Sequence, residues 1–148
     1  MAGNIRLEVV TPEKYVVDEE VQIAVAPGTL GEFGVLIGHT PFLTTLKTGT
    51  VHYTAADGKE KFVFVSGGFA EALPNKVTVL AESAERRRDI DSDRAKTAME
   101  RAQDRLAKEK AEDIDFNRAR AALERALIRI RIRPPDKTQR FLYLLDRQ

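Results

Sequence analysis

The chain has 148 residues, of which 43% are hydrophobic and 32% charged, with a formal net charge of +1 and no cysteine. This length can form one domain of moderate core, or a small domain with an appendage. The lack of cysteine excludes disulfides, thiolate chemistry and cysteine-bound zinc. The two histidines, His39 and His52, stand in different local contexts, which disfavours a histidine metal cluster.

The chain begins without a hydrophobic signal segment, and no apolar stretch approaches the roughly 20 residues that a membrane span needs. These features predict a reducing, cytoplasm-like compartment.

Glycine, proline and charge divide the chain into two parts. All nine glycines lie at or before Gly68, and no proline occurs between Pro74 and Pro134. Residues 1–84 carry six Lys and Arg against ten Asp and Glu, whereas residues 85–148 carry eighteen against thirteen. The basic second part favours acidic partners: an acidic protein surface, nucleotide phosphates or, with less support, nucleic acid.

The first part predicts a small all-β domain, because short runs of alternating or β-rich residues are separated by turn residues. Asp57-Gly58 and Pro74-Asn75-Lys76 are two such turns, and the first is among the strongest hairpin signals. The predicted strands are residues 5–9, 21–25, 51–55, 62–65, 69–73 and 77–80. Short strands with tight connections predict an antiparallel sandwich or a flattened barrel.

The second part has helical periodicity. An Asp- and Ser-rich capping segment, residues 89–93, precedes the first apolar stripe, Asp115 is the expected N-cap of the second helix, and Pro134-Pro135 ends it. The first stripe is Ala95, Ala98, Met99, Ala102 and Leu106, and the second is Phe116, Ala119, Leu123, Ala126, Leu127 and Ile130. Because alanine contacts contribute little, we expect a marginal helix pair that opens or docks elsewhere.

The predicted fold is therefore α+β: an N-terminal antiparallel β-sandwich followed by a C-terminal antiparallel two-helix hairpin. The predicted domains are the sandwich at residues 1–84, the helical hairpin at residues 85–133 and a C-terminal extension at residues 134–148. That extension contains a short apolar patch at residues 141–145.

A glycine-rich segment, GEFGVLIGHTP at residues 31–41, has the glycine spacing of a phosphate loop. It lacks the Gly-Lys-Ser/Thr ending, and no helical pattern follows it, which argues against that function. Two interpretations remain. The glycines allow turns with positive φ between strands, or residues 28–38 form an exposed, rigid recognition loop with Glu32 at its tip.

The longer segment GEFGVLIGHTPFLTTLKTG resembles the signature of the epsilon subunit of bacterial F-type ATP synthase. SGGFAE at residues 66–71, followed by VTVLA at residues 77–81, looks like the second signature of these subunits. IDSDRA at residues 90–95 matches the Ile/Leu-Asp-x-x-Arg-Ala pattern found in many members. The resemblance covers residue 4 to about residue 133. It departs at Ile37, where the family usually has proline, and at residues 134–148, which extend past the usual end.

The resemblance implies a sandwich that binds the gamma subunit of the central rotor and rests on the c-ring in the membrane. It also implies that the hairpin inhibits ATP hydrolysis. The hairpin lies folded beside the sandwich or extends along gamma towards the catalytic alpha and beta subunits. The expected contacts with gamma and the c-ring are Gly31, Glu32, Phe33, Gly38 and His39.

Two arginine triplets repeat the spacing i, i+7, i+11, which places each triplet within about 40° on an ideal helix. They are Arg94, Arg101 and Arg105, then Arg118, Arg125 and Arg129. Alone, this pattern favours a solvated basic face. The resemblance favours stripes that meet acidic loops of the catalytic subunits in the extended state or bind nucleotide phosphate in the folded state.

In family members that bind ATP, the site consists of the Ile-Asp-x-x-Arg-Ala motif and arginines of both helices. By matching positions, Ile90, Asp91 and Ala95 would lie on the nucleoside side, and Arg94, Arg101, Arg125 and Arg129 would approach the phosphates. Asp91 is also explained as a helix-start residue near the positive end of the helix dipole. The ATP would be regulatory, and no cofactor is required.

We therefore predict a non-catalytic central-stalk subunit of a proton-translocating F-type ATP synthase, peripheral on the cytoplasmic side of the cell membrane. It would touch the membrane only through the complex. The sequence offers no nucleophile–base pair, metal cluster or paired carboxylates. A nucleic-acid-binding module is the alternative, but acidic residues interleave with the basic ones and the hairpin has few aromatics. A small enzyme, such as an isomerase on a sandwich, ranks last.

Overall fold

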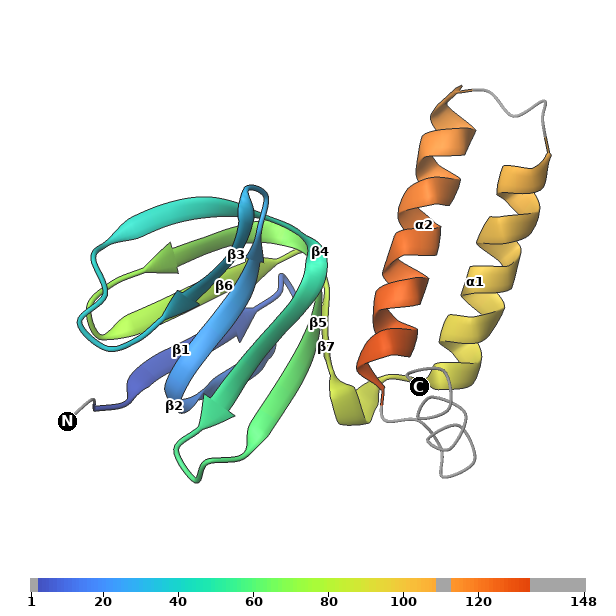
Figure 1. Ribbon diagram of the computed structural model, residues 1–148. Coiled ribbons are helices and arrows are strands. Elements are labelled where there is room, and N and C mark those ends of the chain that lie inside the picture. Colours follow the sequence, from blue (N-terminus) through green and yellow to red (C-terminus); the bar gives the residue numbers. More distant parts are fainter. Residues whose placement is uncertain (1–2, 109–112, 134–148) are drawn as a thin grey trace, which may run out of the picture.

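The computed structural model describes residues 3–108 and 113–133, which form a β-domain followed by two helices (Figure 1). The strands are β1 (Ile5–Val10), β2 (Tyr15–Gly28), β3 (Gly31–Val35), β4 (Phe42–Ala55), β5 (Glu60–Ala72), β6 (Lys76–Ala81) and β7 (Ala84–Arg86). The 3-10 turn η1 (Arg87–Asp89) leads into α1 (Ser92–Ala107) and α2 (Asp113–Ile132). The predicted α+β fold is thus confirmed. The predicted extension, residues 134–148, lies outside the described residues.

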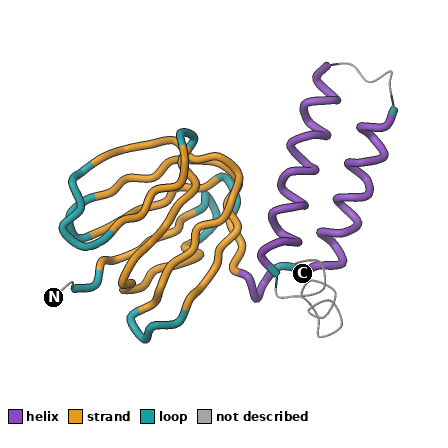
Figure 2. The backbone as a smooth tube through the Cα atoms, in the orientation of Figure 1, coloured by secondary structure: helices purple, strands orange, loops and turns teal. Residues whose placement is uncertain are grey.

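The β-domain closes on itself as a flattened, barrel-like sandwich (Figure 2). Strand β1 pairs with β2 on one side and with β6 on the other, so the hydrogen-bonded order β1-β6-β5-β4-β2 returns to its start. The β1–β6 pair is parallel, whereas every other strand pair in the described residues is antiparallel, as predicted. Closure leaves few open strand edges, which limits unwanted pairing with other chains.

Alternate side chains of each strand point inward and fill the interior of the sandwich. Ile5, Leu7 and Val9 of β1 are fully buried, and Val77 and Val79 lie beside them on β6. Burying each such side chain stabilises the fold by about 1.5–3 kcal/mol relative to exposure. This buried cluster draws all its members from the β-domain. The sandwich core therefore forms without the helices.

Three strands are longer than predicted. The predicted strands 62–65 and 69–73 are parts of one strand, β5, which continues through Gly67 and Gly68. Both glycines have positive φ, and a Cβ at Gly68 would collide with the carbonyl oxygen of Leu80. The two glycines therefore bend the strand rather than end it. Strands β2 and β4 also begin earlier than expected, at Tyr15 and Phe42.

The predicted recognition loop at residues 28–38 is largely a β-hairpin, so this expectation was wrong. Strand β3 pairs antiparallel with β2, from Gly28↔Gly31 to Ala24↔Val35. Glu32 therefore lies within a strand, and the tip is the turn formed by Thr29 and Leu30. Leu30 is fully exposed there.

The two helices form the antiparallel hairpin that the alanine stripes predicted (Figure 1). Ala95 and Ala102 of α1 and Ala119 and Ala126 of α2 are buried, which lets the helices approach closely. Helix α2 begins at Asp113, so Asp115 is not its N-cap as predicted. Neither described helix is long and apolar enough to cross a membrane.

Candidate functional site

The hairpin packs on the sandwich through a small apolar cluster. Phe64 of β5 points outward, because its neighbours Val63 and Val65 face the sandwich core. Phe64 is fully buried with Ile90 and Ile132. Phe62 and Ile128 pack at the edge of this group, which we call the junction cluster: Phe62, Phe64, Ile90, Ile128 and Ile132. At this cluster, helix α2 packs on strands β4 and β5.

Arg129 of α2 reinforces the junction with two further contacts. Its guanidinium lies over the Phe64 ring, 4.1 Å from the centroid, and its Nε and Nη2 lie 3.0 and 2.9 Å from Glu85 Oε1 on β7. A second cation–π contact places Arg87 4.8 Å from the centroid of Phe62. The Nε of Arg87 is buried without a hydrogen-bond partner among the described residues. Cation–π contacts like those of Arg129 and Arg87 are strongest when water is partly excluded.

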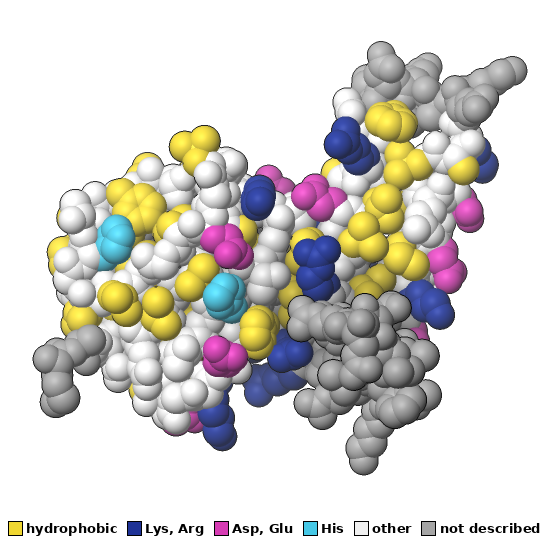
Figure 3. Space-filling model, viewed as in Figure 1, with side chains coloured by type: hydrophobic (Ala, Val, Ile, Leu, Met, Phe, Trp, Pro, Cys, Tyr) yellow, Lys and Arg dark blue, Asp and Glu magenta, His cyan; other side chains and the backbone are white. Residues whose placement is uncertain are grey.

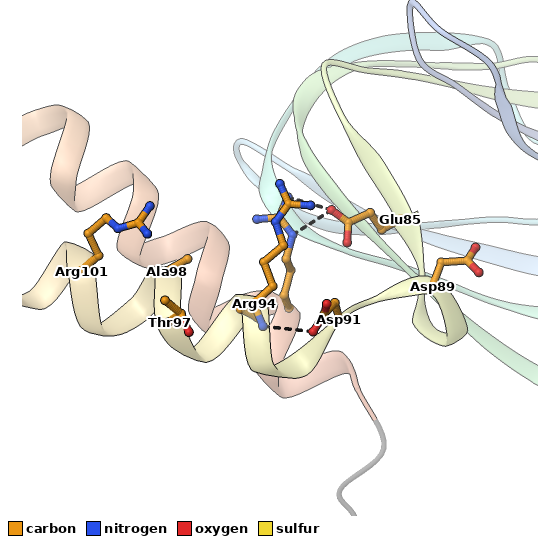
Figure 4. Close-up of a pocket in the computed structure, with 9 residues that line it drawn as sticks. Glu85, Asp89, Asp91, Arg94, Thr97, Ala98 and Arg101 are labelled. Atoms are coloured by element: carbon orange, nitrogen blue, oxygen red, sulfur yellow. Dashed lines mark hydrogen bonds and ion pairs between the residues drawn. The ribbon is translucent and has the colours of Figure 1, made fainter.

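A hollow of about 630 Å³ opens beside this junction (Figure 4). Its walls come from β7, η1 and both helices, so the hairpin must be docked for the hollow to exist. The lining residues are Glu85, Asp89, Asp91, Arg94, Ala95, Thr97, Ala98, Arg101 and Arg129. Its volume lies within the range of small-molecule sites, about 300–1,000 Å³.

Charge is distributed unevenly around the hollow. Glu85, Asp89 and Asp91 line the hollow from β7, η1 and the residue before α1, and Arg94 and Arg101 line it from α1 (Figure 4). Neither arginine makes an ion pair within residues 3–108 and 113–133. No group of His, Asp and Glu in those ranges is arranged to hold a metal ion. Glu85 is already paired with Arg129, so within the described residues the hollow offers the carboxylates of Asp89 and Asp91 and the guanidinium groups of Arg94 and Arg101, which make no ion pair.

Asp91 is the N-cap of α1. Its Oδ1 accepts a hydrogen bond from the Arg94 backbone nitrogen at 3.0 Å. A cap of this kind stabilises a helix by about 1 kcal/mol. The helix-start explanation of Asp91 is therefore sufficient for its position, although its side chain also borders the hollow.

The structure brings together five of the seven residues predicted for ATP: Asp91, Arg94, Ala95, Arg101 and Arg129. Ile90 instead belongs to the junction cluster, and Arg125 does not line the hollow. Sequence reasoning missed Glu85, Asp89, Thr97 and Ala98. Thr97 and Ala98 fall one turn from Arg94 and Arg101, a signal that was available in the helical spacing.

The residues predicted to contact gamma and the c-ring lie together at another part of the sandwich. Phe33 packs edge-on against Phe42 with ring centroids 5.0 Å apart, and the His39 ring lies 5.1 Å from the same Phe42 ring. Gly38, with φ near +80°, donates its backbone N–H to Pro74. Gly31 and Glu32 precede Phe33 in β3. Because the rings of Phe33 and His39 both contact the Phe42 ring, these contacts hold β3 next to the segment that contains Gly38 and His39.

One tyrosine inside the sandwich has a perturbed pKa. Burial, and secondarily the nearby carboxylate of Glu19, raises the pKa of the Tyr53 phenol well above its ordinary value. Glu19 is paired with Lys61 at 3.0 Å. Tyr53 therefore stays protonated at any physiological pH, and this group is a structural one.

A β-sandwich domain followed along the chain by a helical hairpin is the domain arrangement of a known class of protein. The family model for the ATP synthase delta/epsilon chain β-sandwich domain matches residues 4–87, and the model for its long α-helix domain matches residues 88–132. The chain belongs to the family of bacterial ATP synthase epsilon chains.

Two relatives support this assignment. The ATP synthase epsilon chain of Desulfatibacillum aliphaticivorans is 67% identical over 110 residues, covering 74% of this chain and 78% of the relative. That of Desulfosudis oleivorans is 62% identical over 106 residues, covering 72% and 80%. A chain of the Euglena gracilis mitochondrial ATP synthase, solved with OSCP, F1 and the c-ring, has the same fold. It has a TM-score of 0.72 at 24% identity, covering 82% of this chain and 76% of that one.

Proposed function

We propose that this chain is a non-catalytic subunit of the central stalk of a proton-translocating F-type ATP synthase. It would couple the gamma subunit to the c-ring, and its hairpin would inhibit ATP hydrolysis by the alpha and beta subunits. The complex would hold it peripherally at the cytoplasmic side of the cell membrane. The family assignment supports the first part, and the solved neighbours include ATP synthase assemblies with a c-ring.

The observation that carries the inhibitory role is the contrast between two apolar clusters. The sandwich core contains twenty buried residues, all from the β-domain, whereas the junction cluster buries only Phe64, Ile90 and Ile132. The helices are therefore the less stable unit. Local opening follows the number of buried apolar contacts, so the hairpin should leave the sandwich while the sandwich stays folded.

Regulatory ATP would bind in the hollow at the junction. Arg94 and Arg101 would carry the charge that binds the phosphates, and the carboxylates of Asp89 and Asp91 would accept hydrogen bonds from the amino group of the base. Because β7 and both helices contribute walls, ATP would bind only the docked hairpin and would oppose release. A complete reversal from 1:99 to 99:1 needs a preference of about 10⁴-fold.

The contact with gamma and the c-ring would involve Gly31, Glu32, Phe33, Gly38 and His39. The exposed turn at Leu30 and the aromatic group around Phe42 support a rigid, projecting surface here. A cysteine at Glu32 should cross-link to a cysteine in the polar loop of the c subunit. Labelling by bulk reagent alone, with no cross-link, would count against this contact.

Truncation tests the division of roles. Strand β7 pairs with β5 at Ala84↔Val65, and Arg86 Nε donates to the Val16 carbonyl at 2.6 Å, so the variant should end after Arg88. We expect it to assemble with gamma and the c-ring and to raise ATP hydrolysis. Failure to assemble would overturn the assignment of rotor binding to the sandwich. Assembly without increased hydrolysis would overturn the inhibitory role.

A further inference from the structure

Strand β7 is the last part of the sandwich before the hairpin, and its register places Glu85 beside Phe64. Glu85 lies opposite Phe64 of β5, and the next residue, Arg86, lies opposite Val63. Because opposite residues of two paired strands share a face, Glu85 points outward with Phe64 and Arg86 points to the inner side. This register explains why one guanidinium, that of Arg129, reaches both Glu85 and Phe64. The position of β7 therefore determines half of the docking contact.

Arg86 binds a β-bulge in β2. The register between β1 and β2 shifts after Val9↔Val17, which leaves Val16 as an extra residue without a partner on β1. The carbonyl oxygen of Val16 accepts a hydrogen bond from Arg86 Nε at 2.6 Å. Val16 is buried, and an acceptor in such a place is costly to leave without a donor. The bulge thus provides an acceptor that holds the end of β7 on the sandwich.

The residue before β7 is held as well. The side-chain oxygens of Ser66 and Ser83 lie 2.6 Å apart, and the backbone nitrogen of Ser83 donates to Ser66 Oγ at 3.1 Å. In return, the backbone nitrogen of Ser66 donates to the Ser83 carbonyl at 3.0 Å. Together with the bond from Arg86, these contacts fix β7 to the sandwich at both of its ends.

The chain is held less firmly directly after β7. The turn η1 has no side-chain N-cap and no buried residue, and its closing bond, from the Ile90 backbone nitrogen to the Arg87 carbonyl, is 3.4 Å long. Arg87 rests on the Phe62 ring, a contact that can break without loss of backbone pairing. Figure 3 shows basic side chains gathered between the sandwich and the hairpin.

Firm local structure resumes at Asp91, which caps α1. Ile90 is buried, but in the junction cluster, whose parts separate when the hairpin leaves. Segments with few hydrogen bonds and little burial open most easily. Residues 87–90 are therefore the weakest connection between the fixed β7 and the capped α1.

We infer that β7 stays on the sandwich when the hairpin leaves, that residues 87–90 are the hinge, and that Arg86 is a positioning residue for docking. Arg86 acts through Glu85: by holding β7 on the bulge of β2, it keeps the Glu85 carboxylate beside Phe64. A released hairpin then returns to a site that is already formed. The inference rests on the proposed release of the hairpin from the sandwich.

Amide hydrogen exchange in the isolated full chain locates the hinge. Arg129→Gln removes both contacts of that side chain and should raise the ratio of undocked to docked hairpin about 30-fold. The amides of residues 84–86 should keep their protection in this variant. Protection that falls by a similar factor would place the hinge before β7 and overturn the inference. A hairpin that never leaves the sandwich would overturn the proposed release, and the hinge with it.

Arg86→Met tests the positioning role, because it removes the donor and keeps the length of the side chain. Loss of the Glu85 contact should lower the ratio of docked to undocked hairpin about fivefold. In a Glu85→Gln background the same change should have little further effect, a coupling that a merely structural role would not produce. Arg88→Met is the matched control, since the Arg88 side chain is 75% exposed. Equal ratios for Arg86→Met and Arg88→Met would refute the role of Arg86.

A disulfide between Val65→Cys and Ala84→Cys, which are opposite on β5 and β7, should replace the anchor. The chain has no other cysteine. After oxidation, Arg86→Met should regain the docked ratio of the unaltered chain, and the hairpin should still open. Ser66→Cys with Ser83→Cys provides a second lock in case the buried Val65 position does not tolerate the change. A lock that keeps the hairpin from opening, or that leaves the Arg86→Met defect in place, would overturn the inference.

Discussion

The Arg129 contacts allow a quantitative test of hairpin docking. Replacing Arg129 with Gln removes both the ion pair to Glu85 and the cation–π contact with Phe64, while Ile128 and Ile132 keep their apolar contacts. We expect the hairpin to leave the sandwich more often and the sandwich to remain folded. The loss falls on the junction because the sandwich core contains no helix residue.

The size of the effect follows from the exposure of the two partners. The side chains of Arg129 and Glu85 are 23% and 33% exposed, so solvent screens the ion pair and it contributes about 1 kcal/mol. The cation–π contact at 4.1 Å adds about 1 kcal/mol. A total of about 2 kcal/mol changes the ratio of docked to undocked hairpin about 30-fold.

Single-molecule energy transfer measures that ratio. Dyes attached at Lys59→Cys in the β4–β5 turn and Glu100→Cys on α1 report the distance between sandwich and hairpin, since both positions are exposed. A urea series below the unfolding of the sandwich brings both populations into range. Glu85→Gln should give about half of the effect, because it leaves the contact with Phe64 in place. Added salt should reduce the difference in docked fraction between the unaltered chain and the Glu85→Gln variant.

Arg105→Gln serves as the matched control, since Arg105 is exposed on α1 and makes no ion pair within the described residues. The reasoning is refuted if Arg129→Gln and Arg105→Gln give the same docked fraction. It is also refuted if Arg129→Gln lowers the urea midpoint of the sandwich itself, because the contact would then stabilise the β-domain rather than the docking.

Three further predictions concern a glycine, a cap and the hollow. Gly68→Ala should destabilise the sandwich severely in thermal unfolding, because its Cβ meets the Leu80 carbonyl, whereas Gly58→Ala, at positive φ in open space, should cost only about 1 kcal/mol. Asp91→Ala should lower the free energy of unfolding of α1 by about 1 kcal/mol, measured by amide exchange; unchanged exchange would disprove the cap. Arg101→Ala should weaken ATP binding about tenfold or more by calorimetry, while Arg125→Ala, outside the hollow, should not, and equal losses would contradict the site.

The β-domain and hairpin were predictable because their signals are local. Asp57-Gly58 lies in the turn between β4 and β5, and the alternation of Ile5, Leu7 and Val9 places all three inside. Strand β3 was missed because Gly31 and Gly34 resemble turn residues, and its pairing with β2 is what makes it a strand. The parallel β1–β6 pair was missed because β1 and β6 lie far apart in the sequence, and their pairing leaves no local signal in either segment.

The site was predictable only in part, because helical spacing identifies a face but not the partner that covers it. Arg125 and Arg129 lie one turn apart on α2, yet only Arg129 lines the hollow. Phe64, which points out of the sandwich core in the structure, packs against Ile90 and Ile132 where α2 docks. Ile128 and Ile132 lie off the predicted apolar stripe of α2, so their contact with Phe64 could not be found from the periodicity of the helix alone.

Strands β4 and β5 give the molecule a continuous mechanical element. They pair from Phe42↔Ala72 to Thr54↔Glu60, so the ladder begins beside His39 and passes Phe64, where α2 docks. A hydrogen-bonded ribbon resists stretching and sliding far more than a loop, because each shift of register would turn buried side chains outward. The β4–β5 ladder thus connects the surface around His39 to the strand segment on which α2 docks, with the bend at Gly67 and Gly68 between them. The predicted rotor-contact residues and the docking site of the hairpin therefore lie on the same pair of strands.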